Sequence, residues 1–425
     1  MKALHAPAAG VPAPALPGLE LPAAPRRDGP PPVVISWGLG RDSSTILALA
    51  LGDPRTLPMY QSLGYDPATM IVIHAVTGDE WDDTLRDAEH HILPLLREHG
   101  VRLVQVARGG PFEADGIEIL DDSRSPTRLH KAGPWRLSDE LRTSGTVPML
   151  AHGRRTCSVK FKGSVIDRFI AADLQGCSYR HVLGFNADEG ERVLRDQTYT
   201  SATRAPEYPL ITWGYDTADC VALLRERFGV TWKKSYCVQC PFPGNIGGLP
   251  GHLERLRAFP ERAAEVLMLE HVALSLNPNS RLFGSTTLRS HVVADRNTEA
   301  LTAFRHAQAA GSWSVYQVRR ILWPRGDEHL KGPAWRSVRT LGVAGSHAEA
   351  TQELRRRAGE RGGVIEVDEH RIARVWERHR GETYPTREAF DVVAPAVVLD
   401  KARPEFATAW GELEYRAKQP LLPGS

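Results

Sequence analysis

Residues 33–44 of the chain read VVISWGLGRDSS, and residues 45–51 continue as TILALAL. The β-branched run at the start predicts a buried strand, Gly38 and Gly40 predict a tight turn, and the apolar run predicts a helix. A helix that begins directly after a strand turns its backbone N–H groups and the positive end of its dipole toward one point. The stretch therefore predicts a strand–loop–helix unit with an anion site at its loop.

The residue types in this loop favour phosphate as the anion. The hydroxyl groups of Ser36, Ser43 and Ser44 add hydrogen-bond donors, and glycine lets the backbone approach the anion without a Cβ in the way. The loop is not a Walker loop, because no Gly-Lys-Ser/Thr closes it, and it lacks the third glycine of the dinucleotide-binding turn. A plain α/β turn capped by serine and aspartate is the alternative interpretation.

Apolar segments farther along the chain repeat the strand–helix pattern. Strands are predicted at 70–76, 101–106 and 181–185, and helices at 82–99 and around 165–170. Strands that alternate with helices of this length predict an α/β fold with a doubly wound parallel sheet. Ligands of such sheets bind beyond the carboxyl ends of the strands, which is where the first loop lies.

The first loop resembles the pyrophosphate loop (PP-loop) of the ATP-pyrophosphatase superfamily, whose signature reads Ser-x-Gly-x-(x)-Asp-Ser. Its aromatic residue after the first serine is similar to that of relatives of phosphoadenylylsulfate (PAPS) reductase. The residues that carry this match are Ser36, Gly38, Gly40, Asp42 and Ser43.

Further segments resemble elements of the same family and follow in the family's order. They read TGDE at 77–80, RRTCSVKFK at 154–162, GFNADEGER at 184–192, YPLITW at 208–213 and KSYCVQCPF at 234–242. The resemblance covers about residues 33–245. It implies a PP-loop ATP-pyrophosphatase or PAPS reductase-like domain with the HUP-type, adenine nucleotide alpha-hydrolase-like fold.

The resemblance also implies an ATP site with Mg²⁺ between the phosphates and Asp42. The nucleotide-binding residues that it implies are Ser36, Gly38, Gly40, Arg41, Asp42, Ser43, Ser44, Thr77, Gly78, Gly184, Asp188 and Glu189. The catalytic residues that it implies are Asp42, Arg154, Cys157, Lys160 and Arg192. The cations among them, together with Lys162, would neutralise charge on a leaving pyrophosphate. The alternatives are turn-capping roles for Asp188 and Glu189, and a surface ion pair for Lys162.

Three cysteines are candidates for metal or sulfur chemistry. Two residues separate Cys237 from Cys240, a spacing that lets two thiolates face one ion. Cys157 lies in the segment that the family places at the same mouth of the sheet. The resemblance to sulfur-transfer members of the superfamily implies a [4Fe–4S] cluster with one open iron on Cys157, Cys237 and Cys240. Zinc with a fourth ligand such as His152, a redox dithiol, and a pair that only packs a turn are the alternatives.

The composition is typical of a soluble enzyme of several domains. The chain has 425 residues, 42% of them hydrophobic, and a formal net charge of +2, which gives no general bias toward nucleic acid. Five cysteines favour a reducing compartment over a disulfide framework, and no apolar run reaches membrane-spanning length. We therefore expect a cytoplasmic protein with no membrane partner, in which residues 1–32, rich in proline and alanine, form a disordered leader.

The region after residue 245 is expected to be a mainly helical extension. Helical patterns at 261–276, 301–309 and 314–322 predict a helical subdomain over 246–340, and an arginine-rich helical tail module is predicted for 341–425. Arginine clusters such as Arg355-Arg356-Arg357 favour a solvated helical face paired with glutamate, and a phosphate-tracking patch is the alternative.

The function implied by these features is adenylation of an acceptor, with ATP converted to AMP and pyrophosphate. The cysteines favour sulfur transfer to tRNA, DNA or a small molecule as the next step, and a sulfur-donor protein and a second copy of the chain are candidate partners. Reduction of PAPS or adenylylsulfate is one alternative, although the sequence has no adjacent cysteine pair and its last cysteine is Cys240. A non-catalytic nucleotide-binding protein is the other.

Overall fold

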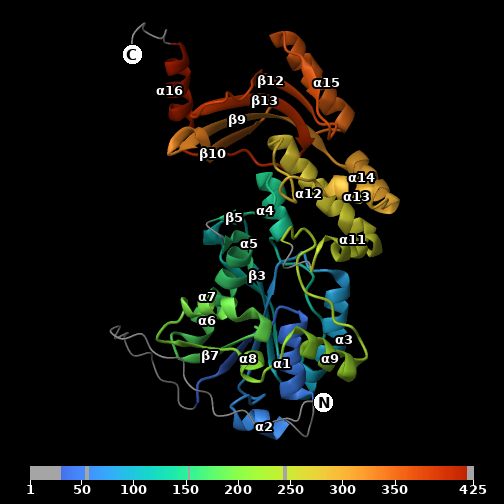
Figure 1. Ribbon diagram of the computed structural model, residues 1–425, viewed down its shortest axis with the longest axis vertical. Coiled ribbons are helices and arrows are strands. Elements are labelled where there is room, and N and C mark those ends of the chain that lie inside the picture. The colour runs from blue at the N-terminus through green and yellow to red at the C-terminus, as the bar shows by residue number, and fades with distance from the viewer. Residues whose placement is uncertain (1–29, 53–56, 152–153, 243–246, 419–425) are drawn as a thin grey trace. The chain divides into compact units, whose positions relative to one another are not determined.

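The computed structural model describes residues 30–52, 57–151, 154–242 and 247–418. They form two compact units (Figure 1). The first unit comprises Met1–Ser138 and Met149–Gly248, and the second comprises Asp139–Pro148 and Leu249–Ser425. Nearly all of the predicted leader, residues 1–29, lies outside the described residues.

The first unit is built on a six-stranded sheet with the strand order β4-β3-β2-β1-β7-β8. Every neighbouring pair in it is parallel except β3 with β4, so the predicted α/β class and the mostly parallel sheet are confirmed. The strands are β1 (Val33–Ser36), β2 (Ile71–Val76), β3 (Arg102–Arg108), β4 (Ile117–Ser123), β7 (Tyr179–Leu183) and β8 (Arg204–Glu207).

Helices cover both faces of this sheet (Figure 1). Side chains of α1, α3 and α9 pack with Val33 and Ile35 on one face, and those of α6 pack with Val34 on the other. The first strand is therefore buried on both sides, which explains its uninterrupted β-branched run. The helices are α1 (Arg41–Leu51), α2 (Leu57–Ser62), α3 (Asp82–Glu98), α5 (Thr156–Ser158), α6 (Ser164–Leu174), α7 (Gly190–Gln197), α8 (Pro209–Thr212) and α9 (Thr217–Phe228).

The order in which strands are added to the sheet changes direction at β1. The chain proceeds from β1 to β2 and β3 on one side, and β7 later joins β1 on its other side. Loops at the carboxyl ends of β1 and β7 therefore diverge, and such a switch point is where ligands of doubly wound sheets bind. Short elements complete the unit: β5 (Leu150–Ala151), β6 (Arg154–Arg155), η1 (Glu113–Asp115), η2 (Val159–Gly163) and η3 (Ala187–Glu189).

The second unit contains an antiparallel five-stranded sheet, so the expectation of a mainly helical extension is wrong. The strand order is β10-β9-β13-β12-β11. The strands are β9 (Trp313–Arg325), β10 (Asp327–Thr340), β11 (Ile365–Val367), β12 (Ala373–Arg378) and β13 (Thr386–Pro395). Because β9 pairs with both β10 and β13, one sheet crosses residue 340, and the predicted boundary there does not separate two modules.

The predicted helix at 314–322 lies within strand β9, which pairs with a neighbour on each side. Tyr316 and Val318 pack into one cluster with residues of α12, whereas Trp313 and Val315 pack into another with residues of α15. Because both faces of β9 are covered, apolar residues occur at odd and even positions, and the period of two that marks a half-buried strand is hidden. The β-branched and aromatic residues were the available signal for a strand.

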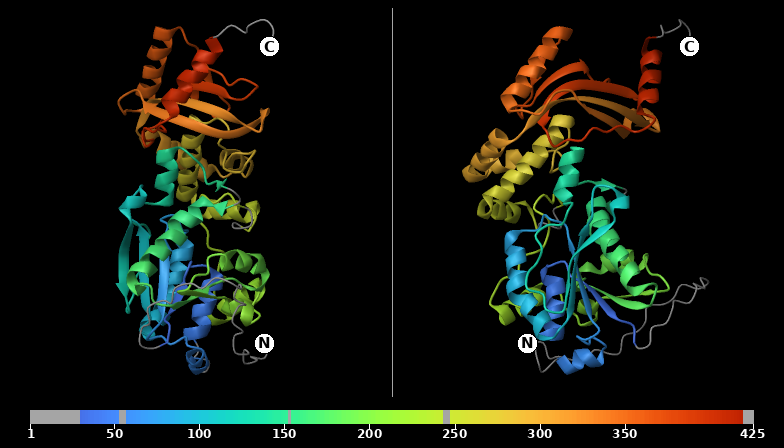
Figure 2. Two further views of the ribbon diagram at one scale, coloured as in Figure 1. Left: turned by 90° about the vertical axis from the view of Figure 1, so that its left-hand side faces the viewer. Right: turned by 180° about the vertical axis from the view of Figure 1, so that it is seen from behind.

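The helices of the second unit pack on both faces of its sheet. Figure 2 shows α15 and α16 on one side and α12 on the other. The predicted helices at 261–276 and 301–309 are confirmed as α12 (Pro260–Leu276) and α14 (Thr298–Ala310). The others are α11 (Leu249–Ala258), α13 (Leu288–Ala294), α15 (His347–Arg361), α16 (Phe406–Lys418) and α4 (Leu137–Ser144), which begins in the first unit. No helix among the described residues combines the length and apolarity that a membrane span requires.

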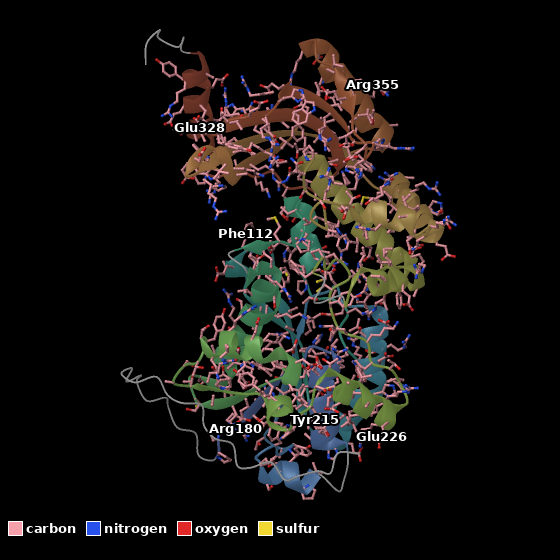
Figure 3. The ribbon with its side chains drawn as sticks, in the orientation of Figure 1. Phe112, Arg180, Tyr215, Glu226, Glu328 and Arg355 are labelled. Atoms are coloured by element: carbon pink, nitrogen blue, oxygen red, sulfur yellow. The ribbon has the colours of Figure 1, made fainter. Side chains whose placement is uncertain are left out.

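The arginine cluster at 355–357 lies on α15, where Figure 3 labels Arg355. Arg356 pairs with Glu353 and Glu360, and Arg357 pairs with Glu353. These pairs between residues three and four positions apart are what the solvated helical face requires, and they favour it over the phosphate-tracking patch.

Phe390 on β13 tests the antiparallel sheet. Its side chain is fully buried opposite Val318 in the cluster shared with α12. We expect Phe390→Ala to lower the free energy of unfolding of this unit by about 3–5 kcal/mol, because it removes a large buried side chain and leaves a cavity. Chemical denaturation measures the change, and Leu330→Ala, at a position 57% exposed on β10, is the control that should stay within about 0.5 kcal/mol of wild type. Equal effects of the two substitutions would contradict the assignment of β13 to a core strand.

Candidate functional site

The loop between β1 and α1 is held in one conformation by contacts to its backbone. Leu39 adopts a left-handed backbone conformation, with φ of 59°, and its side chain is fully buried. The indole N–H of Trp232 donates to the Leu39 carbonyl at 3.0 Å. The first helical turn of α1 follows Gly40, and among the described residues this N-cap position has no side-chain capping hydrogen bond. Its leading N–H groups therefore remain available at the mouth of the sheet.

Three glycines around this loop differ in the space that surrounds them. Apart from its chain neighbours, no atom of the described residues would lie within 4 Å of a Cβ on Gly38, whereas a Cβ on Gly40 would lie 3.2 Å from Ser235 Cβ. A Cβ on Gly184, directly after β7, would lie 2.8 Å from the backbone nitrogen of Ser43. The loop is thus packed closely at Gly40 and against the end of β7, but it is open at Gly38.

The three predicted serines point in different directions. The Ser43 hydroxyl lies within the loop, where its Oγ accepts from the Gly38 N–H at 3.3 Å. The Ser44 side chain is fully buried beneath the loop and accepts from the indole N–H of Trp37 at 3.0 Å. Ser36 Oγ lies 2.8 Å from Nε2 of a buried histidine on β7, His181. Ser36 and Ser43 therefore border the loop, whereas Ser44 belongs to the core.

Asn186 connects the loop with the end of β7. Its side-chain N–H groups donate to Asp42 Oδ1 at 3.1 Å and to Thr217 Oγ1 at 3.0 Å. Arg41 approaches the same Asp42 oxygen at 3.4 Å. The structure therefore brings the predicted pair Arg41 and Asp42 together. Asn186 was missed by sequence reasoning. Its position directly after the predicted strand 181–185 offered only a weak signal.

The predicted acidic pair after Asn186 makes local contacts. Asp188 Oδ2 accepts a hydrogen bond from the Thr217 N–H at 3.0 Å. This hydrogen bond and a second one from the Thr217 hydroxyl lower the pKa of the Asp188 carboxyl group. Glu189 accepts from Arg192 at 2.7 Å, and the Arg192 guanidinium lies 4.3 Å from the centre of the Phe185 ring. The contact with Thr217 favours the turn-capping role for Asp188. The guanidinium of the predicted catalytic Arg192 is bound by Glu189 and Phe185.

A second polar cluster lies at the end of β2 and is linked to the loop. Lys162 Nζ lies 3.3 Å from Glu80 Oε1, and the negative charge of Glu80 raises the pKa of the lysine. The Ser235 hydroxyl lies 3.2 Å from Glu80 Oε2 and 2.8 Å from the Gly38 carbonyl oxygen, to which it donates. Glu80 and Ser235 were not among the predicted site residues, although both lie in segments that resemble the family.

The predicted residues Thr77 and Gly78 have packing contacts. Thr77 Oγ1 lies 3.5 Å from Glu80 Oε1 and 3.6 Å from Cys237 Sγ. Gly78 has a φ of 86°, and a Cβ there would run into the Arg136 side chain. The glycine is therefore required by the turn and by the close packing of Arg136 over it.

The cysteines lie near the second cluster but are not gathered as ligands. Burial raises the pKa of Cys237 well above its ordinary value, and burial together with Cys240 raises that of Cys157. Among the described residues, no three or more histidine, cysteine or acidic side chains are arranged to hold a metal ion. Cys157, Cys237 and Cys240 do not form such a group, and a cluster on these residues stays a prediction.

Two predicted residues near Cys157 differ in how far the structure describes them. Lys160 is exposed on η2. Arg154 belongs to β6 by its backbone, but its side chain lies outside the described residues, as does all of His152.

The buried His74 on β2 is expected to make the folding stability of the first unit fall at acidic pH. It is 2% exposed, its Nδ1–H donates to the Trp37 carbonyl at 3.1 Å, and burial lowers its pKa to about 4. Between pH 6.5 and 4 the unfolded chain takes up a proton at this residue and the folded chain does not, so folding stability falls as the pH falls. We expect up to about 3 kcal/mol to be lost from this source across that range.

Urea denaturation at several pH values measures this loss. The decrease between pH 7 and 4.5 should be smaller in His74→Gln than in wild type, because the variant has no ring to protonate. His90→Gln, at an exposed position of α3, should retain the wild-type decrease. The same decrease in all three proteins would contradict the prediction.

Comparison with known proteins leaves the family of the chain open. No family model matches it, and no curated protein matches it at significant similarity. The resemblance of its segments to the ATP-pyrophosphatases therefore stays a prediction, and the function has to be argued from the geometry of the loop and of the clusters around it.

Proposed function

We propose that the chain is an ATP-pyrophosphatase that binds ATP with its phosphates over Gly38 and adenylates an acceptor. The observation that carries this proposal is the open space at Gly38, beside an uncapped helix N-terminus at the switch point of the sheet. Elsewhere the same loop is packed tightly, so the opening is confined to the position where an anion would meet the backbone N–H groups. An anion that fills this space would complete the hydrogen bonding of the first turn of α1.

The charges around the loop suit a nucleoside triphosphate. Lys162 supplies a positive charge whose partner, Glu80, is tied to the loop through Ser235. Asp42 lies at the start of α1, where a bare phosphate would be repelled by its carboxylate. Mg²⁺ bound with ATP would reduce this repulsion and polarise the phosphate oxygens, with Asp42 as the residue that holds it.

The proposed reaction is a displacement at the α-phosphorus of ATP. An oxygen of the acceptor forms the new bond to that phosphorus, and the bond to the oxygen that bridges the α- and β-phosphates breaks, so that pyrophosphate leaves. The N–H groups of the loop and Lys162 would stabilise the charge that develops on the leaving group. Because these groups are already in place, positioning and electrostatics would supply most of the rate enhancement.

The second step that we propose is sulfur transfer to a nucleic acid or a small molecule. A sulfur nucleophile from a donor would form a bond to the activated carbon of the acceptor, and AMP would leave with the oxygen. Support for sulfur comes from the thiol of Cys237, whose Sγ lies 3.6 Å from Thr77 Oγ1, beside the pair of Glu80 and Lys162. A protein that only binds the nucleotide would leave ATP intact, which separates that alternative from the proposal.

Gly38→Ala tests the phosphate site without disturbing the packing. Beyond the two chain neighbours, the added methyl group meets no atom within 4 Å in the part of the chain that the structure describes, so the melting temperature should stay at the wild-type value. The same methyl group would occupy the space proposed for the phosphates, and we expect the affinity for ATP·Mg²⁺ to fall about tenfold or more in titration calorimetry. Adenosine, which has no phosphate, should bind both proteins alike.

Gly359→Ala is the matched control, because it adds a methyl group to open space on α15 in the second unit. It should bind ATP·Mg²⁺ as wild type does. Unchanged ATP affinity in Gly38→Ala would place the phosphates elsewhere, and a wild-type chain that binds no ATP would refute the proposed function. Release of AMP and pyrophosphate when candidate acceptors are added tests the catalytic part.

The predicted [4Fe–4S] cluster is tested by metal content. Iron and acid-labile sulfide are measured after anaerobic purification of wild type, Cys237→Ala and Cys177→Ala. If the three thiols move together to bind a cluster, iron and sulfide should be present in wild type and in Cys177→Ala but lost from Cys237→Ala. Wild-type protein without iron would contradict the cluster and leave ATP binding at the loop unaffected. Zinc measured on the same samples distinguishes the other metal.

A further inference from the structure

A chain of hydrogen bonds leads from the proposed phosphate loop into the core of the first unit. Ser36 Oγ lies 2.8 Å from His181 Nε2, and His181 Nδ1 lies 2.8 Å from Arg204 Nε. The Arg204 guanidinium contacts both oxygens of Asp196, at 2.8 and 2.9 Å. Asp196 also accepts from the hydroxyl of Tyr208 at 2.8 Å. A chain of hydrogen bonds therefore connects Tyr208 with the hydroxyl group of Ser36 through Asp196, Arg204 and His181.

The direction of each hydrogen bond follows from the chemistry of arginine. An arginine Nε–H can only donate, so His181 Nδ1 must be the acceptor nitrogen and carry no hydrogen. Burial and the positive charge of Arg204 lower the pKa of His181 to about 3, which keeps the ring neutral at physiological pH. A neutral ring without hydrogen on Nδ1 carries it on Nε2. His181 therefore donates to Ser36 Oγ, and the serine oxygen is the acceptor.

The hydroxyl hydrogen of Ser36 is consequently directed away from His181. We propose that His181 is a positioning residue that, by donating to Ser36 Oγ, presents the Ser36 hydroxyl as a hydrogen-bond donor to the phosphate bound at the loop. The inference rests on the proposed function, because it assigns a role at the same ATP site. Ser36 is the last residue of β1 and precedes the loop by one residue, so its side chain lies at the edge of the proposed phosphate site.

The other members of the network hold the histidine ring in this orientation. A protonated ring would direct its Nδ1–H toward the Arg204 guanidinium, so that two donors would face each other. A flipped ring would direct a C–H toward it, so that Arg204 Nε would lose its acceptor. Arg204 itself is 8% exposed and is fixed by Asp196, which balances its charge. The Tyr208 ring stacks on Phe185 at 5.7 Å between ring centres, directly after Gly184. The far end of the network is thus anchored to the segment that packs against the loop.

The neighbour of His181 on β7 takes part in a separate ion pair, which provides a structural contrast. Arg180, labelled in Figure 3, precedes His181 on β7, and its side chain points to the opposite face of the sheet. There it pairs with Glu207 and lies 5.2 Å from the centre of the Tyr65 ring. No described contact joins Arg180 to Ser36, so a substitution at Arg180 changes packing on β7 without acting on the loop hydroxyl.

A double-mutant cycle tests whether His181 acts through Ser36. The affinities for ATP·Mg²⁺ and for adenosine are measured by titration calorimetry for Ser36→Ala, His181→Asn and the double variant. We expect each single variant to bind ATP about tenfold more weakly, with adenosine unchanged, because one hydrogen bond to a charged phosphate is lost. The double variant should bind ATP no more weakly than Ser36→Ala, since the hydroxyl that His181 orients is already absent.

Two further variants separate orientation from packing. His181→Gln places an amide N–H near the position of Nε2 and should recover most of the ATP affinity that His181→Asn loses. Arg180→Gln should lower the melting temperature and leave the ATP affinity at the wild-type value. A double variant that loses affinity by the product of the two single effects, about a hundredfold, would overturn the proposal. So would wild-type ATP affinity in His181→Asn.

Histidine ¹⁵N spectroscopy of the wild-type chain tests the proposal without any substitution. Nitrogen shifts distinguish a ring that carries its hydrogen on Nε2 from one that carries it on Nδ1. We expect the Nε2–H form for His181, with and without ATP·Mg²⁺, and the Nδ1–H form or a charged ring would overturn the proposal even if His181→Asn failed to fold. Absence of ATP binding by the wild-type chain would refute the proposed function itself, and the inference with it.

Discussion

The close approach of Gly184 to Ser43 is the contact on which the candidate site depends. Only 2.8 Å would separate a Cβ at Gly184 from the backbone nitrogen of Ser43, so the end of β7 and the first turn of α1 can meet only because a glycine stands there. This contact brings Asn186 to Asp42 on one side of the loop. On the other side the pairing of β7 with β1 brings His181 to Ser36. The polar groups around the loop are thus positioned by backbone packing.

The loop itself combines strain with support. Leu39 adopts a left-handed conformation that costs a residue with a side chain roughly 1–2 kcal/mol, and the Trp232 hydrogen bond together with complete burial of the leucine stabilises it. In the loop that contains this residue, α1 begins without a side-chain cap and Gly38 faces open space. The first N–H groups of a helix have no partner within the helix, and these are the groups to which we assign the phosphates. Lys162 is also connected to the loop, because its partner Glu80 contacts Ser235 and Ser235 donates to the Gly38 carbonyl.

Two arginines of the second unit bind backbone carbonyl groups at helix ends, a role that the charge pattern of the sequence does not reveal. Arg374 donates to the carbonyl groups of Leu274 and Ser275 at the end of α12, and Arg336 donates to those of Ser144 and Gly145 after α4. Cations are favourable at these positions because the carbonyl groups of a last helical turn lack partners and carry the negative end of the helix dipole. Much of the basic character of this region therefore serves its own fold.

The sequence by itself determined the local elements: the strand–loop–helix unit at 33–51, the alternation that makes the sheet parallel, and the loop residues Gly38, Asp42 and Ser43. These follow from neighbours in the chain, whose spacing decides backbone conformation. Only the tertiary structure decided that Asn186, Glu80, Ser235 and His181 surround the loop, since the contacts that join them to the loop and to Lys162 span 82 to 197 positions. It also decided that 314–322 is a strand. A segment covered on both faces loses its period, and its conformation then depends on the partners with which it pairs.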